Sequence, residues 1–65
     1  MLDGNKIRRL REAAELTHEE LGRKVGLSQS MISFLESNLK ETNTTKAALI
    51  AKALGVTVND LLKTG

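Results

Sequence analysis

Two short helices joined by a tight turn are predicted for residues 16–36, whose sequence is LTHEELGRKVGLSQSMISFLE. Thr17 and Glu20 form a capping-box pattern, in which each side chain bonds the other residue's backbone N–H, so a helix begins just after Thr17. Gly26 tolerates the left-handed backbone that ends a helix, and Ser28 is a suitable N-cap for the next helix. These caps lie so close together that only a tight turn fits between the two helices.

Further helices are predicted on both sides of this stretch. Asp3 is a candidate N-cap, and apolar side chains at helical spacing follow it. The same spacing returns before Gly55, which closes a fourth helix, and either Asn43 or Thr44 opens that helix. A second capping-box pattern starts at Thr57 and opens a final short helix. We therefore expect one all-α domain over residues 1–65, with helices at about 4–14, 18–25, 29–37, 45–54 and 58–63.

The composition supports an all-helical chain and excludes several kinds of site. The 65 residues include no cysteine, no proline, one histidine and one aromatic residue. Disulfides and thiolate metal ligands are therefore excluded, and a single histidine without a carboxylate cluster does not make a zinc site. The net charge of +2 neither supports nor excludes nucleic acid as a partner.

Membrane association and catalysis are not expected. The longest apolar runs are far below the roughly 20 residues that cross a bilayer, and no signal peptide pattern is present. Glu19 and Glu20 are adjacent, so a helix splays them apart, and His18 has no nucleophile to orient. We therefore expect a cytoplasmic protein that is not an enzyme and that holds no cofactor and no metal.

The third predicted helix has an uncharged outward face. Ile32 and Leu35 point inward, and Glu36 lies at the edge of the buried side. Small hydroxyls, one amide and one phenyl ring point outward, from Gln29, Ser30, Ser33, Phe34 and Ser37. Such groups suit base edges, because glutamine bonds adenine, serine is adaptable and a phenyl ring contacts the thymine methyl. Serine-rich faces also occur in bundles that bind no DNA, but the preceding turn and helix favour a DNA reader.

The sequence resembles the helix-turn-helix of the phage repressor/Cro (Xre-like) family. The resemblance rests on the small Gly22 in the second helix, Gly26 in the turn and the branched Ile32 in the third helix. The ending ALGVTVNDLL, residues 53–62, is similar too, so nearly the whole chain takes part. The resemblance implies a compact five-helix bundle of the lambda repressor type, with helix 29–37 in the major groove of a pseudo-palindromic operator.

The resemblance also implies an ion pair inside the domain. Family members often pair an arginine of the first helix with the glutamate that ends the third, which correspond here to Arg11 and Glu36. Spacing places Arg11 in an inward stripe with Ile7, Leu10 and Ala14, where a charge is out of place unless it is paired. We therefore predict a partly buried ion pair between the two side chains.

Candidate DNA contacts follow from the same resemblance. Residue-by-residue transfer assigns base readout to Gln29, Ser30, Ser33 and Phe34, and a phosphate contact to His18. Further candidate phosphate contacts, some of them at helix N-termini that attract anions, are Arg23, Ser28, Lys40, Thr44 and Thr45. For His18 and Lys40 the alternative is a side chain that contacts only water.

Three departures from the family pattern bear on DNA reading. Family members often have glycine where Asn38 stands and proline near Thr42, so the loop after the third helix has more freedom here. Many members also place a charged or longer polar residue near Phe34. Because the serines of the third helix are short, we expect specificity to depend mainly on Gln29, Phe34 and DNA shape.

A homodimer is the expected binding form, because one helix-turn-helix covers only a short half-site. The C-terminal end often forms the dimer contact in this family, and the candidates here are Val58, Leu61 and Leu62. At least one of the three is expected to close the core instead. Leu39 and Leu49 lie off the inward faces and suggest a second apolar surface.

Two functions from different classes are compatible with this pattern. The first is a repressor that occupies its operator, in the nucleoid of a bacterium or as a phage-encoded protein: a Cro-like protein, a restriction-modification controller or the DNA-binding fragment of a longer repressor. The second is a protein-interaction module, such as an antitoxin or an adaptor, that holds a protein partner through Phe34, Leu39 and Leu49.

Overall fold

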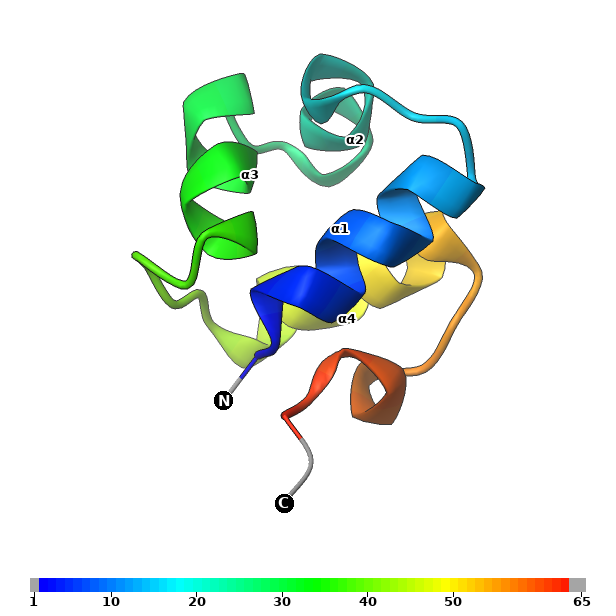
Figure 1. Cartoon of the computed structure of the whole chain (residues 1–65), viewed down its shortest axis with the longest axis vertical. Coiled ribbons are helices and arrows are strands. Elements are labelled where there is room, and N and C mark those ends of the chain that lie inside the picture. The colour runs from blue at the N-terminus through cyan, green and yellow to red at the C-terminus, as the bar shows by residue number, and fades with distance from the viewer. Residues whose placement is uncertain (1, 64–65) are drawn as a thin grey trace.

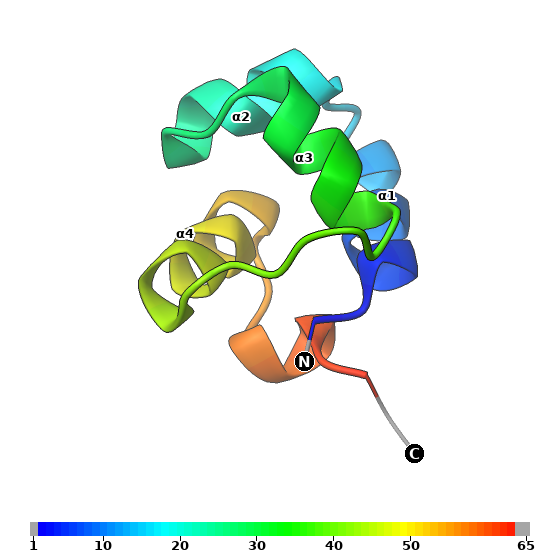
Figure 2. The ribbon, with the colours of Figure 1, turned by 90° about the vertical axis from the view of Figure 1, so that its left-hand side faces the viewer.

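Four α-helices and one short 3-10 helix build residues 2–63, the part of the chain that the computed structural model describes (Figure 1). They are α1 (Gly4–Ala13), α2 (His18–Val25), α3 (Gln29–Glu36), α4 (Thr44–Leu54) and η1 (Val58–Leu61). Figure 2 shows α3 on the side toward the viewer, with the loop that follows it crossing to the start of α4. The predicted all-α class is confirmed.

Each α-helix begins at a side chain that the sequence marks as a cap. The capping residues are Asp3, Thr17, Ser28 and Asn43. Of the two candidates before α4 it is Asn43 whose side chain accepts from the backbone, whereas Thr44 is the first helical residue. Gly26 and Gly55 end α2 and α4 with a φ of 74°, which only glycine adopts without strain. The bounds of the first four helices therefore agree with prediction to within one residue.

The predicted fifth α-helix is wrong, because this segment forms one 3-10 turn. The expected capping box is present at residues 57–60, but the helix stops at Leu61. Leu62 is extended and pairs with Leu2 in an isolated antiparallel bridge. The carbonyl of Leu61 accepts a hydrogen bond of 2.7 Å from the backbone N–H of Asp3. The N-terminal segment thus occupies the backbone groups that a further helical turn would need.

The end of α1 also differs from prediction. Ala14 is exposed and does not join the buried stripe, because α1 ends at Ala13 and Glu15 takes a left-handed φ of 59°. This turn brings the backbone N–H of Leu16 to 3.1 Å from the carbonyl of Arg11. The half-buried Leu16, rather than Ala14, therefore packs against the core at this end.

All five elements contribute to one apolar core. Its fully buried large side chains are Ile7, Leu21, Ile32, Leu35, Ile50 and Leu61. Complete burial of such a side chain contributes about 1.5–3 kcal/mol relative to leaving it in water. Leu61 is one of these residues, so η1 closes the core with it.

Gly4 sets α1 directly against the end of α3. A Cβ at this position would collide with the carbonyl oxygens of Leu35 and Glu36. The backbone N–H of Gly4 donates a hydrogen bond of 3.0 Å to Oδ1 of Asn38. Asn38 itself ends α3 with a φ of 60°, a conformation that asparagine tolerates better than most residues. One loop residue therefore caps the start of α1 with its side chain and ends α3 with its backbone.

Gly22 allows α2 to approach the turn that leads into α3. A Cβ on Gly22 would lie 2.5 Å from the carbonyl oxygen of Leu27. The carbonyl of Gly22 also accepts a 2.9 Å hydrogen bond from the backbone N–H of Leu27. The turn therefore folds back onto α2 at a residue that has no side chain.

Gly22→Ala is expected to destabilise the protein by about 1–3 kcal/mol, the usual range for overpacking. Alanine ordinarily stabilises a helix relative to glycine by about 0.5–1 kcal/mol, so the contact with Leu27 reverses the expected sign. The midpoint of urea unfolding measures the effect. Lys24→Ala, at an exposed position of the same helix, is the control and should change stability by no more than about 0.5 kcal/mol. An unchanged or raised midpoint for Gly22→Ala would contradict the packing described.

Candidate nucleic-acid interface

The outward face of α3 borders a shallow hollow together with the start of α2. The hollow has a volume of about 230 Å³, and its lining residues are His18, Gln29, Ser30, Ser33 and Phe34. Gln29 and Ser30 are exposed, Ser33 is half-buried and the Phe34 side chain is 42% exposed. The structure thus gathers all four predicted base readers, with His18 beside them, around this one hollow.

Local caps orient this surface. Ser28 Oγ accepts a 3.0 Å hydrogen bond from the backbone N–H of Met31, which fixes the start of α3 just before Gln29. At the start of α2, Thr17 Oγ1 accepts from the backbone of Glu20, and the Glu20 carboxylate accepts from the backbone of Thr17. These hydrogen bonds to the charged form lower the pKa of Glu20. Both helix starts that border the hollow are therefore held by their own sequences.

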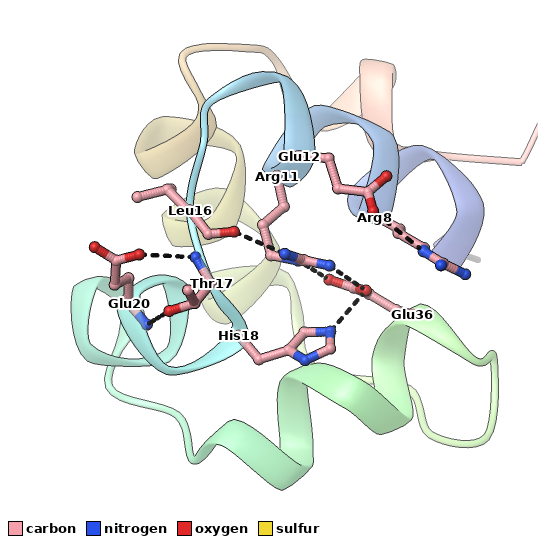
Figure 3. Close-up of polar contacts among 8 residues, drawn as sticks. All are labelled: Arg8, Arg11, Glu12, Leu16, Thr17, His18, Glu20 and Glu36. Atoms are coloured by element: carbon pink, nitrogen blue, oxygen red, sulfur yellow. Dashed lines mark hydrogen bonds and ion pairs between the residues drawn. The ribbon is translucent and has the colours of Figure 1, made fainter.

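Arg11 and Glu36 are in direct contact beneath this surface (Figure 3). Arg11 Nε donates to Glu36 Oε2 at 2.6 Å, and Nη2 donates to Oε1 at 3.2 Å. Nη1 donates to the carbonyl of Leu16 at 2.7 Å. Residue exposure is 9% for Arg11 and 7% for Glu36, so the two-pronged contact is made largely out of water, where such a pair is shortest and strongest. It ties α1 to the C-terminal end of α3.

His18 joins this pair from the start of α2. Its Nε2 lies 3.0 Å from Glu36 Oε1, the same oxygen that accepts from Arg11. The His18 side chain is 34% exposed, so it is neither free in solvent nor fully buried. Figure 3 shows the His18 ring reaching the Glu36 carboxylate from below, whereas Arg11 reaches it from above. One carboxylate therefore connects α1, α2 and α3.

The protonation of Glu36 reflects two opposing effects. Burial acts to raise the pKa of its carboxyl group, while hydrogen bonds from Arg11 and His18 act to lower it. The balance leaves the pKa of Glu36 below its ordinary value. The pKa of Arg11 is raised, chiefly by its hydrogen bond to Glu36. Both groups are therefore charged at neutral pH.

The remaining predicted phosphate contacts do not line the hollow. Lys40, Thr44 and Thr45 are exposed on the loop after α3 and on the first turn of α4. Arg23 is exposed on α2, where its guanidinium lies 3.5 Å from the carboxylate of Glu19. Such an exposed ion pair contributes little to stability, so Arg23 is free to exchange it for another anion. The exposed Ser28 completes this set.

The three predicted dimer residues differ in burial. Leu61 is fully buried, so its assignment to a dimer interface is wrong: its side chain is used in the core of its own chain. Val58 and Leu62 are half-buried and border a hollow of about 150 Å³ next to the start of α4. Leu39 is 71% exposed and Leu49 is 38% exposed.

Two parts of this site were missed in the sequence. The contact between His18 and Glu36 joins residues that are far apart in the chain, so no periodicity predicts it. The carbonyl of Leu16 becomes an acceptor for Arg11 only because Glu15 is left-handed. The capping box just before His18 was the one local signal that its position is held in place.

The family model described as "Helix-turn-helix" matches residues 7–61 of the chain. A crystal structure of the P22 c2 repressor in complex with a synthetic operator is similar to it, with a TM-score of 0.90. That protein has 33% sequence identity, and the match covers 97% of this chain and 96% of the other. The chain belongs to the phage repressor/Cro-type helix-turn-helix family.

Two further solved structures are similar to this helix-turn-helix protein, one over most of its own length and one over only part of it. The restriction-modification controller protein C.AhdI from Aeromonas hydrophila has 27% identity and a TM-score of 0.86, over 91% of this chain and 89% of the other. Hydroxypropylphosphonic acid epoxidase from S. wedmorenis has 21% identity and a TM-score of 0.86, over 92% of this chain and only 32% of the enzyme. That second likeness shows the fold alone. A search of curated protein sequences finds no significant match.

Within residues 2–63, three or more potential metal-ligating side chains do not come together. None of the helices described is long and apolar enough to cross a membrane.

Removal of either partner of the buried ion pair is expected to cost about 3–5 kcal/mol, because it leaves the other charge buried without compensation. Glu36→Gln and Arg11→Met are the variants, and urea unfolding at pH 7 is the measurement. The control is Glu12→Gln on the same α1, since the Arg8–Glu12 pair is more than half exposed at 3.7 Å and should be worth at most about 1 kcal/mol. Equal effects at the buried and exposed pairs would refute the structural role of Arg11 and Glu36.

Stability is expected to fall in acid through Glu36. Its pKa is lower in the folded chain than in the unfolded one, so its contribution is complete above about pH 5 and is lost as the pH falls through the folded-state pKa. Urea unfolding at a series of pH values between 7 and 3 should show a steeper decline for the parent protein than for Glu36→Gln. Glu20→Gln is the comparison: the pKa of Glu20 is also lowered, but by an exposed capping interaction, so its removal should flatten the decline less than Glu36→Gln. Parallel declines in the parent and Glu36→Gln would contradict the prediction.

Proposed function

We propose that this protein is a sequence-specific DNA-binding transcriptional regulator, and that it represses by occupying an operator with α3 in the major groove. Sequence-specific DNA binding follows from membership of the helix-turn-helix family. The P22 c2 repressor, at 33% identity over nearly the full chain, is itself bound to an operator in its crystal structure. The role proposed is binding, without catalysis and without a cofactor.

The observation that carries this proposal is the uncharged outer face of α3. Gln29 and Ser30 stand exposed on its first turn, and Phe34 presents a ring one turn later. These groups carry the amide, hydroxyl and apolar surface that read base edges, and no charge on this face repels DNA. Glu36, the one charged residue of α3, is turned inward against Arg11. The face can therefore enter the groove while charged groups around it contact phosphates.

The proposed phosphate contacts form the rim of this face. Lys40 lies on the loop beyond α3, and Thr44 and Thr45 lie at the start of α4, where free backbone N–H groups attract anions. His18, Arg23 and Ser28 are the proposed contacts from α2 and from the cap of α3. These contacts position the protein on the duplex, while the α3 face supplies the sequence preference.

We further propose that the protein binds a pseudo-palindromic operator as a homodimer. A single α3 covers a short half-site, and two copies with recognition helices about 34 Å apart read one face of the duplex. Val58 and Leu62 supply half-buried apolar surface beside the start of α4, in place for a contact between copies. We place the protein in the cytoplasm of a bacterium, at the nucleoid, as a product of its own genome or of a phage.

A second candidate function is favoured by the exposed leucines. Leu39 is 71% exposed on the loop after α3, and Leu49 is 38% exposed on α4. A protein-interaction module of the antitoxin or adaptor kind would cover such side chains with a protein partner. This alternative predicts protein binding without an enriched DNA sequence, so the test of the first function also tests it.

Selection from a random duplex library at about 150 mM salt tests the proposed function. We expect an enriched palindrome with half-sites about one helical turn apart. Weak, salt-sensitive binding without enrichment would reject the repressor in favour of the protein-interaction module.

Two single substitutions should have different effects on the selected site. Gln29→Ala is expected to cost about 1–3 kcal/mol and to relax the preference at one base pair, because a base contact is lost. Lys40→Ala is expected to weaken binding to all sequences alike and to lower the salt slope by about one, because a phosphate contact is lost. Fluorescence anisotropy on matched and mismatched duplexes measures both. If the two variants behave alike, the assignment of α3 to base readout is wrong.

The dimer is tested by light scattering during gel filtration across a range of protein concentrations. The parent protein should approach the mass of two chains as concentration rises, or when a duplex with two half-sites is added. Val58→Asp should shift the equilibrium toward the monomer, because a charge at a half-buried position is costly to enclose. Asn5→Asp, at an exposed position outside that hollow, is the control for added charge. A strict monomer under all these conditions would exclude the homodimer.

A further inference from the structure

His18 has one ring nitrogen committed to Glu36 and one that is not. Nε2 lies 3.0 Å from Glu36 Oε1, and an ionised carboxylate can only accept, so Nε2 must carry a hydrogen. Within residues 2–63, the other ring nitrogen, Nδ1, makes no hydrogen bond. The two nitrogens point in different directions around the ring, and Figure 3 shows Nδ1 on the side turned away from the carboxylate. The neutral ring thus presents a lone pair, and not a donor, at Nδ1.

A phosphate oxygen is also only an acceptor. The His18 side chain is 34% exposed and borders the hollow formed with Gln29, Ser30, Ser33 and Phe34. A DNA backbone that passes this edge would meet the lone pair of neutral His18 and be repelled by it. The ring can hold Glu36 and donate to a phosphate at once only when both nitrogens carry hydrogen, as in the imidazolium ion.

We infer that DNA binding by this protein is linked to the uptake of one proton at His18. The protonated ring donates a hydrogen bond to a DNA phosphate, so this phosphate contact forms as the pH falls. This inference rests on the proposed function and adds a regulatory property to it. The proton comes from solvent, adds to Nδ1 and is shared with the phosphate as a charge-assisted hydrogen bond. By reciprocity, lower pH tightens DNA binding, and bound DNA holds the proton on the ring.

The charges around His18 allow this change. From α3 the ring faces the carboxylate of Glu36, and Arg11 of α1 shares that carboxylate. On its own helix, Glu19 follows directly, and the Glu20 carboxylate is held by the Thr17 cap. The α3 residues that share the hollow are all uncharged. A phosphate at this edge would therefore bring a negative charge that the hollow itself does not supply.

The composition makes the linkage measurable. His18 is the only histidine in the chain, and the chain has no cysteine. Histidine is the side chain whose charge ordinarily changes between pH 5 and 8, whereas the carboxylates titrate below this range and Lys and Arg above it. Phosphodiesters keep one charge throughout. A change in affinity across this range in the parent but not in a His18 variant therefore reports on one side chain.

The experiment measures Kd by fluorescence anisotropy from pH 6 to pH 8 at constant ionic strength, on the duplex obtained by selection and on an arbitrary 20-base-pair duplex. We expect Kd to rise by roughly tenfold over this range on both duplexes, with a slope of log Kd against pH that never exceeds one, because one proton is taken up. The arbitrary duplex should respond equally, since a phosphate contact carries no sequence information.

His18→Gln is the decisive variant. Its amide N–H₂ can donate to Glu36 and to a phosphate without titrating, so the Kd of this variant should be independent of pH. Lys40→Ala is the matched control, because it loses a proposed phosphate contact that does not titrate: its Kd should be higher at every pH, with the slope of the parent. Thermal unfolding confirms that both variants are folded.

The outcomes separate this inference from the proposed function. Absence of binding to either duplex at any pH would overturn both. Binding that is independent of pH in the parent, tighter at high pH, or equally pH-dependent in His18→Gln would overturn the inference alone. Nitrogen-15 NMR of the free protein gives an independent test: the neutral His18 ring should be the Nε2–H tautomer, and an Nδ1–H tautomer would also overturn the inference.

Discussion

The carboxylate of Glu36 is the buried charge on which the arrangement of the first three helices depends. It accepts two hydrogen bonds from Arg11 of α1 and one contact from His18 of α2. Its own helix is α3, so one side chain connects all three elements. A buried carboxylate is tolerated only when such partners are present. This requirement selects one relative placement of α1, α2 and α3, and hence one orientation of the face proposed to read DNA.

This arrangement also explains why the outer face of α3 is neutral. The one charged residue of the helix is used inside the molecule, so short polar groups and one phenyl ring remain outside. Because this face is neutral, only charged groups outside α3 can attract the DNA phosphates. The net charge of the chain is only +2, so this attraction is limited. We therefore expect modest non-specific affinity, sensitive to salt. Discrimination between sequences then depends on Gln29, Phe34 and the shape of the duplex more than on many direct bonds.

The same network joins structure and binding in one residue. Were His18 free in solvent, its proposed phosphate contact would be independent of the core. Because Nε2 is held by Glu36, the position of the ring is set by the packing of α1 against α3. The start of α2, which bears this ring, is in turn fixed by its own capping box. We therefore expect substitutions at Arg11 to affect the position of His18 at the proposed interface, although Arg11 itself is buried.

The helices and their starts were predictable from the sequence, because caps and periodicity act over a few neighbouring residues. Thr17, Ser28 and Asn43 accept from backbone groups three positions away, and Gly26 and Gly55 need only their own φ. The unusual position of a charge in the α1 stripe also predicted that Arg11 needed a partner. Family resemblance, and not spacing, indicated Glu36 as that partner.

Only the tertiary structure decided which distant groups meet. The antiparallel bridge of Leu2 with Leu62 replaced the last predicted helical turn, and the left-handed Glu15 turned Ala14 out to solvent. The contact of His18 with Glu36 and the burial of Leu61 likewise depend on how whole helices pack. The physical reason is separation along the sequence: a helix cap or the apolar face of a helix is specified by residues a turn or two apart. A buried ion pair, a core position or a backbone bridge exists only after separate segments have been brought together and water has been excluded between them.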